Sequence, residues 1–259
     1  MTPETVRLPD GRRWQVLTAG RGPDLLWLHG VRGIPAHDPL LQRLAAHRRV
    51  IAPLAPGFGD ADELEHVGNV HDLALAYDDL RRHLGLERPV VVGHSFGGMI
   101  AAELAAHFPD AVSRLVLLAP FGLWDDARPV ADIFAVPAPE VDSLLWHDMT
   151  ARDALWPAAP AADPKAAGAQ IIATAMAMTA VAKFLWPIPD KGLNRRLKRI
   201  TARALLVFGA ADAVVPPAYV AAFARHLRQP EIAVVDRAGH MLPYERTDEV
   251  AALIARFLG

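Results

Sequence analysis

The feature that most constrains this chain is the run VVVGHSFGGMIAAELAAHF at residues 90–108. The three valines resemble a buried strand and the alanine-rich part a helix, which places Ser95 at the junction between them. A sharp strand-to-helix turn strains such a serine and brings neighbouring backbone close to it, and the glycines at 93 and 97 leave room for that approach. The start of the helix adds free N–H groups and partial positive charge. We therefore expect Ser95 to be a nucleophile, with the backbone N–H of Phe96 as an oxyanion donor.

Apolar strands alternate with helices along most of the remaining chain. This alternation predicts an α/β fold with a mostly parallel, doubly wound sheet that helices cover on both faces. A hairpin is expected around Asp10-Gly11, and Thr247 or Asp248 is expected to cap the last helix. Strands are predicted at 24–30, 89–92, 112–120 and 202–212. Two further segments, 48–60 and 231–240, are predicted to begin as strands and to end in loops, the first of them a Pro/Gly loop. Helices are predicted at 39–47, 69–85, 96–107, 216–227 and 247–258.

The alternation stops at Phe121 and resumes after about Arg196. This segment contains four of the six tryptophans, and its eight prolines predict short helices rather than strands. The sequence therefore predicts a core domain formed by residues 1–120 and 197–259, with a helical insertion at 121–196. The most apolar run, at residues 171–182, is shorter than the roughly 20 residues that cross a membrane, so no membrane span is predicted.

Composition limits the partners and the chemistry. Lys and Arg total 27 and Asp and Glu 29, and this net charge of -2 gives no reason to expect nucleic acid or an anionic membrane as partner. The chain has no cysteine, and none of its eleven histidines has H-E-x-x-H spacing, so we predict no metal site. The N-terminal residues show no apolar leader, which favours a cytoplasmic protein. The partner expected is a small-molecule substrate, and the oligomeric state is left open.

A serine hydroxyl needs a neighbouring base, and His240 is the best placed histidine. His240 follows the last predicted strand, and loops at the carboxyl ends of parallel strands meet at one edge of the sheet. Asp212 follows the preceding strand and is the expected acid, with Asp125 and Asp126 as rivals. The order serine, acid, histidine is that of a known class of hydrolases.

The loop LHGVRG at residues 28–33 follows an earlier strand and is expected to supply the second oxyanion donor. The best candidate is the backbone N–H of Val31. In the same region, His29 is expected to support the local backbone. His94 adjoins the serine but is expected to point away from it and to be structural.

Five motifs together resemble the α/β-hydrolase fold superfamily: HGVRG (29–33), PGFGD (56–60), GHSFGG (93–98), FGAADAVVP (208–216) and AGHMLPYERTDEV (238–250). They occur in the order of that superfamily and span nearly the whole chain. The resemblance implies Ser95 as nucleophile, Asp212 as acid, His240 as base, and Val31 and Phe96 as oxyanion donors. It also implies that residues 121–196 form a cap over the site and that the reaction needs no cofactor.

Within the superfamily, haloalkane dehalogenases and epoxide hydrolases carry aspartate at the position of Ser95, which disfavours both. The sequence favours a serine hydrolase that cleaves a carboxylic ester with an apolar acyl or alcohol part. The alternatives are a carbon–carbon bond hydrolase acting on a vinylogous diketone, and a ligand-binding homologue without activity. A mostly apolar pocket is expected under the cap, and Trp124, Trp146 and Met176 are its candidate lining residues.

Overall fold

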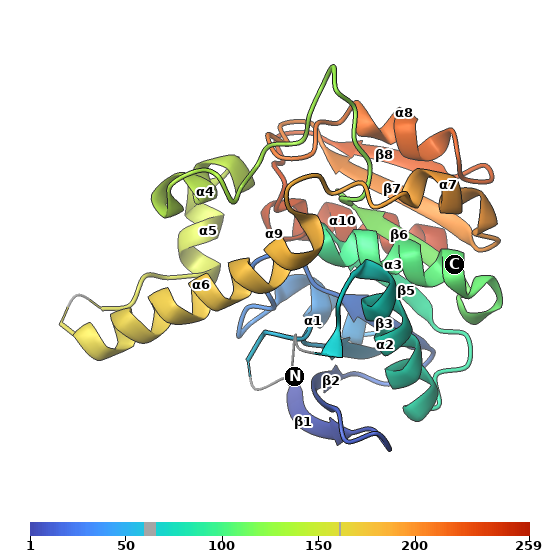
Figure 1. The fold of residues 1–259 in the computed structure, drawn as a ribbon, viewed down its shortest axis with the longest axis horizontal. Coiled ribbons are helices and arrows are strands. Elements are labelled where there is room, and N and C mark those ends of the chain that lie inside the picture. Colours follow the sequence, from blue (N-terminus) through green and yellow to red (C-terminus); the bar gives the residue numbers. More distant parts are fainter. Residues whose placement is uncertain (60–65, 161) are drawn as a thin grey trace.

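The computed structural model describes residues 1–59, 66–160 and 162–259, and its central element is an eight-stranded sheet (Figure 1). The strand order is β1-β2-β4-β3-β5-β6-β7-β8. β1 pairs with β2, and β2 with β4, in antiparallel fashion, and all the remaining pairs are parallel. This confirms the predicted α/β fold. The strands are β1 (Thr2–Arg7), β2 (Arg13–Ala19), β3 (Asp24–Leu28), β4 (Arg49–Pro53), β5 (Val90–His94), β6 (Arg114–Leu118), β7 (Arg203–Gly209) and β8 (Glu231–Val235).

Both faces of the sheet are covered, because successive strand residues alternate between two apolar cores. In β3, Leu26 and Leu28 belong to the core that α2 and α3 cover, whereas Leu25 and Trp27 belong to the core beneath α1 and α10. Such strands have no polar face, which explains their nearly continuous apolar sequence. The helices outside the 121–196 segment are α1 (Pro39–Ala45), α2 (Val70–His83), α3 (Phe96–His107), α8 (Tyr219–Ala224), α9 (Leu242–Glu245) and α10 (Thr247–Leu258), with the 3-10 turn η2 (Pro109–Ala111).

Residues 121–196 form no strand within the part that the structure describes, and the segment leaves the sheet after β6 and returns to it before β7. Its helices are α4 (Ala138–Leu145), α5 (Met149–Leu155), α6 (Pro164–Leu185) and α7 (Leu193–Arg196), followed by the 3-10 turn η3 (Leu197–Arg199). In Figure 1, α6 extends away from the body of the molecule, with α4 and α5 beside it.

α6 corrects two expectations from the sequence. It is a single helix of 22 residues, because Pro164 lies in its first turn, where proline is tolerated, and Pro187 follows its end. The short helices expected between prolines are therefore wrong for this stretch. The run at 171–182, too short by itself, is part of this longer helix, which by length and composition alone is apolar and long enough to cross a membrane; 22% of its most apolar window is buried in the protein.

The start of α10 also differs from the prediction. Neither Thr247 nor Asp248 caps α10: the N-cap residue is Arg246, and the hydroxyl of Thr247 donates instead to the carbonyl oxygen of Pro243 at 2.9 Å. This hydroxyl therefore hydrogen-bonds to the short helix α9, which directly precedes α10. Asp60, the end of the PGFGD motif and of the predicted 48–60 segment, lies outside the described residues.

Candidate active site

Ser95 occupies the turn between β5 and α3, as the sequence predicted, and its backbone has φ 57° and ψ -121°. This conformation is rare for a residue with a side chain. It is held by the Ser95 N–H, which donates to the carbonyl oxygen of Leu118 at the end of β6 at 2.8 Å. The glycines that flank the turn are required, since a Cβ on Gly97 would lie 2.1 Å from the carbonyl oxygen of Leu28 and one on Gly93 2.3 Å from that of Gly97.

The structure brings Ser95, His240 and Asp212 into one hydrogen-bonded chain. The Ser95 hydroxyl donates to Nε2 of His240 at 2.7 Å, and Nδ1 of His240 donates to Oδ2 of Asp212 at 2.9 Å. The other carboxylate oxygen of Asp212 accepts the backbone N–H groups of Val214 and Val215, each at 2.8 Å. These bonds fix the carboxylate, which in turn fixes the orientation of the imidazole. In this arrangement His240 can accept the serine proton.

Asp125 and Asp126 do not take part in this chain. Asp125 accepts the N–H of Ala127 at 3.0 Å and pairs with Arg128, while Asp126 accepts the indole N–H of Trp124 at 2.7 Å. Both therefore organise the loop that follows β6 rather than contact His240.

The two expected oxyanion donors belong to two segments that contact the serine, the start of α3 and the turn at Gly30–Gly33. Phe96 is the first residue of α3, and N–H groups in the first turn of a helix have no acceptor within it. Val31 lies in a tight turn, in which the N–H of Gly33 donates to the carbonyl oxygen of Gly30 at 3.0 Å. The N–H of Val31 takes no part in the hydrogen bond that closes this turn. This turn packs directly on the serine, since a Cβ on Gly30 would lie 3.0 Å from Cβ of Ser95.

Two buried histidines support the site. Nε2 of His94 donates to the carbonyl oxygen of His240 at 2.8 Å, which ties β5 to the loop that carries His240. His29 donates from Nδ1 to the Gly30 carbonyl oxygen and accepts the Ala55 N–H at Nε2, so its expected role in supporting the local backbone is confirmed. Burial lowers the pKa of His29 to about 4, and burial together with the neighbouring His240 lowers the pKa of His94 to about 3. Both are therefore neutral near pH 7.

Glu245 is a supporting residue that sequence reasoning missed. Its two carboxylate oxygens accept the N–H of Gly239 at 2.6 Å and that of His147 at 2.8 Å. Burial raises the pKa of this carboxyl, although these backbone hydrogen bonds act in the opposite direction. Glu245 thereby joins the residue before His240 to the link between α4 and α5. The sequence signal was weak, since Glu245 looks like an ordinary charged residue before a helix.

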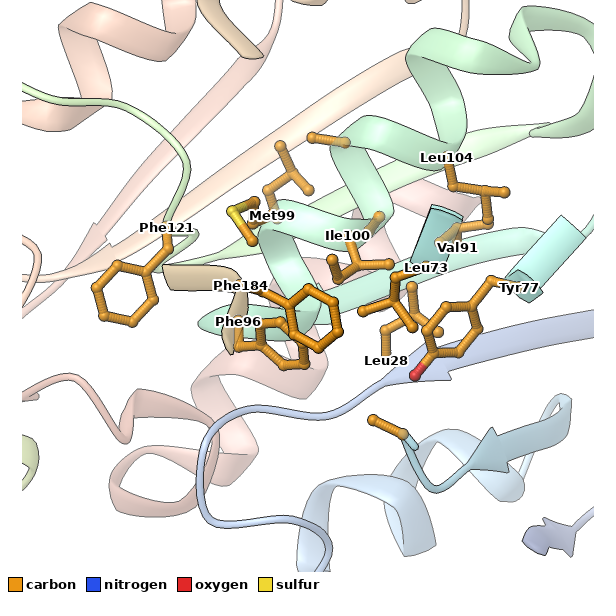
Figure 2. Packing of buried hydrophobic residues seen from close by; sticks show 14 of the residues in the cluster. Leu28, Leu73, Tyr77, Val91, Phe96, Met99, Ile100, Leu104, Phe121 and Phe184 are labelled. Carbon is orange, nitrogen blue, oxygen red and sulfur yellow. The ribbon is translucent and has the colours of Figure 1, made fainter. Parts of the chain in front are cut away.

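The side chains of Ser95 and His240 are enclosed. Ser95 and His240 are both 0% exposed. The ring of Phe121 lies edge-on to His240 with centroids 5.4 Å apart, and Phe184 from α6 stacks on Phe96 at 5.8 Å. Figure 2 shows Phe184 lying against Phe96, with Phe121 on the other side of Met99.

Two cavities lie along α6 and share part of their lining. One has a volume of about 750 Å³ and lies between α6 and the α4–α5 region, and the other, of about 350 Å³, reaches Val31 and the loop after β4. The lining of these cavities, over the described residues, includes neither Ser95 nor His240. The residues common to both are Arg32, Trp156, Gln170, Thr174 and Met178.

The three residues expected to line the pocket lie in different surroundings. Met176 lines the smaller of these two cavities but is 56% exposed. Trp124 lines a separate cavity of about 100 Å³. Trp146 lines none of these three cavities and instead packs against Trp156, with ring centroids 5.7 Å apart. Trp156 and Met178 are thus better placed than Trp124 and Trp146.

The larger cavity also contains charges that the sequence analysis did not consider. Arg32, beside Val31, pairs with Asp142 of α4, whose other oxygen accepts Nε of Arg152 at 2.8 Å. Two guanidinium groups therefore share one carboxylate, and all three side chains are mostly buried.

One group of metal-type ligands occurs among the described residues, on α2 and α3. The ligand atoms of His71, Glu103 and His107 lie within 4.8 Å of one another. However, both oxygens of Glu103 accept bonds from Arg196, at 2.7 and 2.6 Å, and Nδ1 of His107 donates to the Glu103 carbonyl oxygen. A cation at this position would face a guanidinium, so the donor set fits a metal poorly.

Comparison with known proteins identifies the family. The profile of the Alpha/beta hydrolase family matches residues 25–253. The chain belongs to this family. That match covers every element of the sheet from β3 onward together with Ser95, Asp212 and His240. It confirms the resemblance that the five motifs indicated.

Individual members of the family resemble parts or all of the chain. A pimeloyl-[acyl-carrier protein] methyl ester esterase of Vibrio vulnificus is 35% identical over 108 residues, which are 41% of this chain and 39% of that protein. The chain spans less than half the length of the first curated relatives that it matches. A bacterial membrane phospholipase A has the same fold with a TM-score of 0.82 and 24% identity, over 99% of this chain and 85% of the other. A meta-cleavage product hydrolase of Pseudomonas fluorescens has a TM-score of 0.77 and 19% identity, over 98% and 97% of the two chains.

Proposed function

We propose that the protein is a serine hydrolase that cleaves carboxylic esters with an apolar acyl or alcohol part through an acyl-enzyme intermediate. The observation that carries the proposal is the hydrogen-bonded chain from the Ser95 hydroxyl through His240 to Asp212, at 2.7 and 2.9 Å. Its three residues come from loops that follow different parallel strands, β5, β7 and β8, so the fold rather than local sequence assembles them.

In the first step, the oxygen of Ser95 attacks the ester carbonyl carbon while Nε2 of His240 takes its proton. The N–H groups of Phe96 and Val31 donate to the oxyanion that forms, and Asp212 stabilises the imidazolium. His240 then protonates the leaving alkoxide, which departs as an alcohol and leaves the acyl group on Ser95. In the second step, His240 removes a proton from water, and the resulting hydroxide attacks the acyl carbonyl. The bond to Ser95 then breaks, His240 returns the proton to the serine oxygen, and the carboxylic acid is released.

We further propose that residues 121–196 act as a cap on the core formed by 1–120 and 197–259. The enclosure of Ser95 and His240 supports this idea, because a substrate can reach them only if the covering side chains move. Phe184, which stacks on Phe96, is the contact between α6 and the serine turn that such a movement would have to break.

The first test compares substitutions of Ser95, Asp212 and Asp125. Ser95→Ala should lower turnover by about 10⁴-fold or more and abolish labelling by a fluorophosphonate probe, following other triads. Asp212→Asn should also be strongly impaired, because the amide no longer fixes the tautomer of His240. Asp125→Asn is the matched control on the neighbouring loop and should keep its activity. An active Ser95→Ala enzyme, or a greater loss in Asp125→Asn than in Asp212→Asn, would refute the assignment.

The second test concerns the acyl group. The two cavities along α6 have mainly apolar linings, so kcat/KM should rise from acetyl to hexanoyl p-nitrophenyl esters. The rise should be at most about fourfold per methylene, because each buried CH₂ contributes ~0.8 kcal/mol. Trp156→Ala, which opens the wall common to both cavities, should flatten this series, whereas Trp124→Ala should not. If acetate is the best ester, the apolar pocket does not bind the acyl chain.

A carbon–carbon bond hydrolase is the second candidate, because a meta-cleavage product hydrolase shares the fold over nearly the whole chain. A vinylogous 1,5-diketone in the same assay separates the two. If it outperforms every ester and still requires Ser95, the second candidate replaces the first. Tight binding of a small ligand without any turnover would instead favour a non-enzymatic homologue.

A further inference from the structure

The larger cavity along α6 has an excess of positive charge in its wall. Arg32, Asp142 and Arg152 are the charged residues among the described residues that line it, so two guanidinium groups face the space together with one carboxylate. Asp153 also pairs with Arg152, at 2.8 Å, but it does not line the cavity and its side chain is 68% exposed. Water screens most of the effect of such an exposed charge. One positive charge inside the cavity is therefore left largely uncompensated.

Arg32 is the cation that is only partly satisfied. Nε and one terminal nitrogen of Arg152 each lie 2.8 Å from Oδ2 of Asp142, so Arg152 holds this oxygen through two N–H groups. Arg32 contacts only the other oxygen, through one terminal nitrogen. A guanidinium carries five N–H donors, and the Nε of Arg32 is buried without a hydrogen-bond partner. Asp142 therefore leaves part of the donor capacity of Arg32 unused.

The position of Arg32 connects this charge with the serine. Arg32 directly follows Val31 in the turn at Gly30–Gly33, which packs on Ser95. It lines both cavities along α6, and the smaller cavity also reaches Val31. A chain that starts at an acyl carbonyl beside Val31 and continues along α6 therefore has this guanidinium beside its path.

The rest of the larger cavity suits a hydrocarbon chain. Apart from the charged residues it is lined mainly by apolar side chains, among them Phe134, Val141, Trp156 and Met178. Apolar walls with a few polar groups are typical of sites that fix the orientation of a small molecule. A ligand that matches both features is a hydrocarbon chain with an anion at its end.

A carboxylate is the anion that fits best. Its two oxygens lie in one plane and match the N–H groups of a guanidinium, and hydrogen bonds between such charged groups are about twice as strong as neutral ones. It brings one negative charge to a wall with one positive charge in excess. A phosphate monoester would bring up to about two negative charges near pH 7, which exceeds what the wall can compensate.

A purely structural role accounts for only part of this cluster. One cation paired with Asp142 would be enough to join the turn at Gly30–Gly33 to α4, because Arg32 comes from the turn and Asp142 from α4. The second guanidinium adds a mostly buried charge that this link does not need, and burying a charge without a full partner is costly. An anion that enters the cavity offsets this cost.

We propose that the substrate is an ester whose acyl chain carries a carboxylate at its far end, and that Arg32 binds this carboxylate. Arg152 holds Asp142, which keeps that side chain from neutralising Arg32 completely. The reaction then releases an alcohol and a dicarboxylic acid. This inference rests on the proposed ester cleavage and narrows its apolar acyl part to a chain with a charged end.

The first measurement compares esters that differ in one charge. The mono-p-nitrophenyl esters of adipic, suberic and sebacic acid are each assayed beside the neutral ester in which the free carboxyl group is methylated. At the chain length that fits, kcat/KM should be about tenfold or more higher for the anionic ester. The ratio of the two values is the quantity followed, since general damage to the enzyme lowers both together. A ratio near or below one at every chain length would overturn the proposal.

Two substitutions in the cluster should change this ratio in opposite directions. Arg32→Met removes the proposed partner and should lower the ratio about tenfold, whereas Asp142→Asn removes the competing carboxylate and should raise it. A purely structural role would leave the ratio unchanged in both variants.

The matched control is Arg128→Met, in the same 121–196 segment. Its side chain is 61% exposed and pairs with Asp125 outside both cavities, so this variant should keep the parent ratio. An unchanged ratio in Arg32→Met, a fall in Asp142→Asn, or an equal fall in Arg128→Met would contradict the assignment.

Binding without turnover separates this inference from the proposed function. In the Ser95→Ala protein, titration calorimetry with the monomethyl and dimethyl esters of the same three acids should give the monomethyl ester the lower Kd, by about tenfold or more at the chain length that fits. Arg32→Met should remove this difference. If it does while no ester is cleaved, the proposed function fails and the anion site stands. If neutral esters are cleaved through Ser95 but neither ratio depends on Arg32, the anion site fails and the hydrolase stands.

Discussion

Replacing Gly30 by alanine tests how closely the turn at Gly30–Gly33 packs on Ser95. The added Cβ would lie 2.8 Å from Nδ1 of His94 and 3.0 Å from Cβ of Ser95, whereas ordinary contacts begin near ~3.5 Å. The backbone of Gly30 is not in the left-handed region, so alanine adds no conformational strain and the effect is purely steric. Because His94 and Ser95 are both buried, neither can move aside freely.

We expect Gly30→Ala to lower the free energy of unfolding by about 1–3 kcal/mol, the usual effect of overpacking. The turn or the serine must shift by about half an ångström, which should lower kcat/KM by roughly tenfold, since 1 Å of misplacement can account for 10²-fold. Urea unfolding and p-nitrophenyl butyrate hydrolysis measure the two effects. The matched control is Gly168→Ala in α6, where a Cβ meets nothing within 4 Å and should stabilise by about 0.5–1 kcal/mol. Wild-type stability and activity in Gly30→Ala would show that this contact is looser than described.

Three further predictions follow from buried polar groups. Glu245→Ala leaves two backbone N–H groups without acceptors, so the free energy of unfolding should fall by about 2–4 kcal/mol, and kcat should fall as well. An unchanged kcat would mean that the carboxylate does not position His240. The neutral histidines His29 and His94 have lower pKa values folded than unfolded, so their contribution to stability should be full above pH ~6.5 and fall by about 1.4 kcal/mol per pH unit for each histidine as the pH drops from there towards about 4. Asp38 acts in the opposite direction, because burial raises the pKa of its carboxyl to about 6 in the folded protein. In urea titrations, His94→Gln should therefore lower the slope of unfolding free energy against pH by about 1.4 kcal/mol per pH unit relative to the parent protein, and an unchanged slope would count against a buried neutral His94. Arg196→Met should destabilise the protein by about 3–5 kcal/mol, because Glu103 is 0% exposed and loses the guanidinium that pairs with it. The double variant Arg196→Met with Glu103→Met should recover much of this loss, which would not happen if the ion pair were incidental.

The fold was predictable because strand and loop signals are local. The strand–serine–helix run gave β5 and α3 to within a residue or two, and Asn69, which accepts the N–H groups of His71 and Asp72, begins α2 as a helix N-cap should. Sequence reasoning was weaker where contacts with an adjacent segment determine which hydrogen bond a side chain makes. Thr247 is a good capping residue by type, yet the preceding helix uses its hydroxyl.

The arrangement of Ser95, Asp212 and His240 was accessible to sequence reasoning because parallel strands end at one edge of the sheet. The surroundings were not, because they depend on contacts between distant segments. Nothing local distinguishes Trp146, which packs against Trp156, from a residue that faces a cavity. Arg32 could be recognised as part of a cavity wall only once α4 placed Asp142 beside it. The 22-residue length of α6 was missed because the prolines were read as interruptions, although one begins the helix and another follows it.

The pairing of β6 with β7 has a consequence for how such a protein can diversify. The two strands are adjacent in the sheet, from Arg114 opposite Arg203 to Leu118 opposite Val207, although the whole 121–196 segment lies between them in sequence. The ladder is complete without any hydrogen bond from that segment. An insertion, deletion or replacement there leaves the strand register unchanged, so this stretch of the gene can vary while the loops that carry Ser95, Asp212 and His240 are inherited intact from the rest.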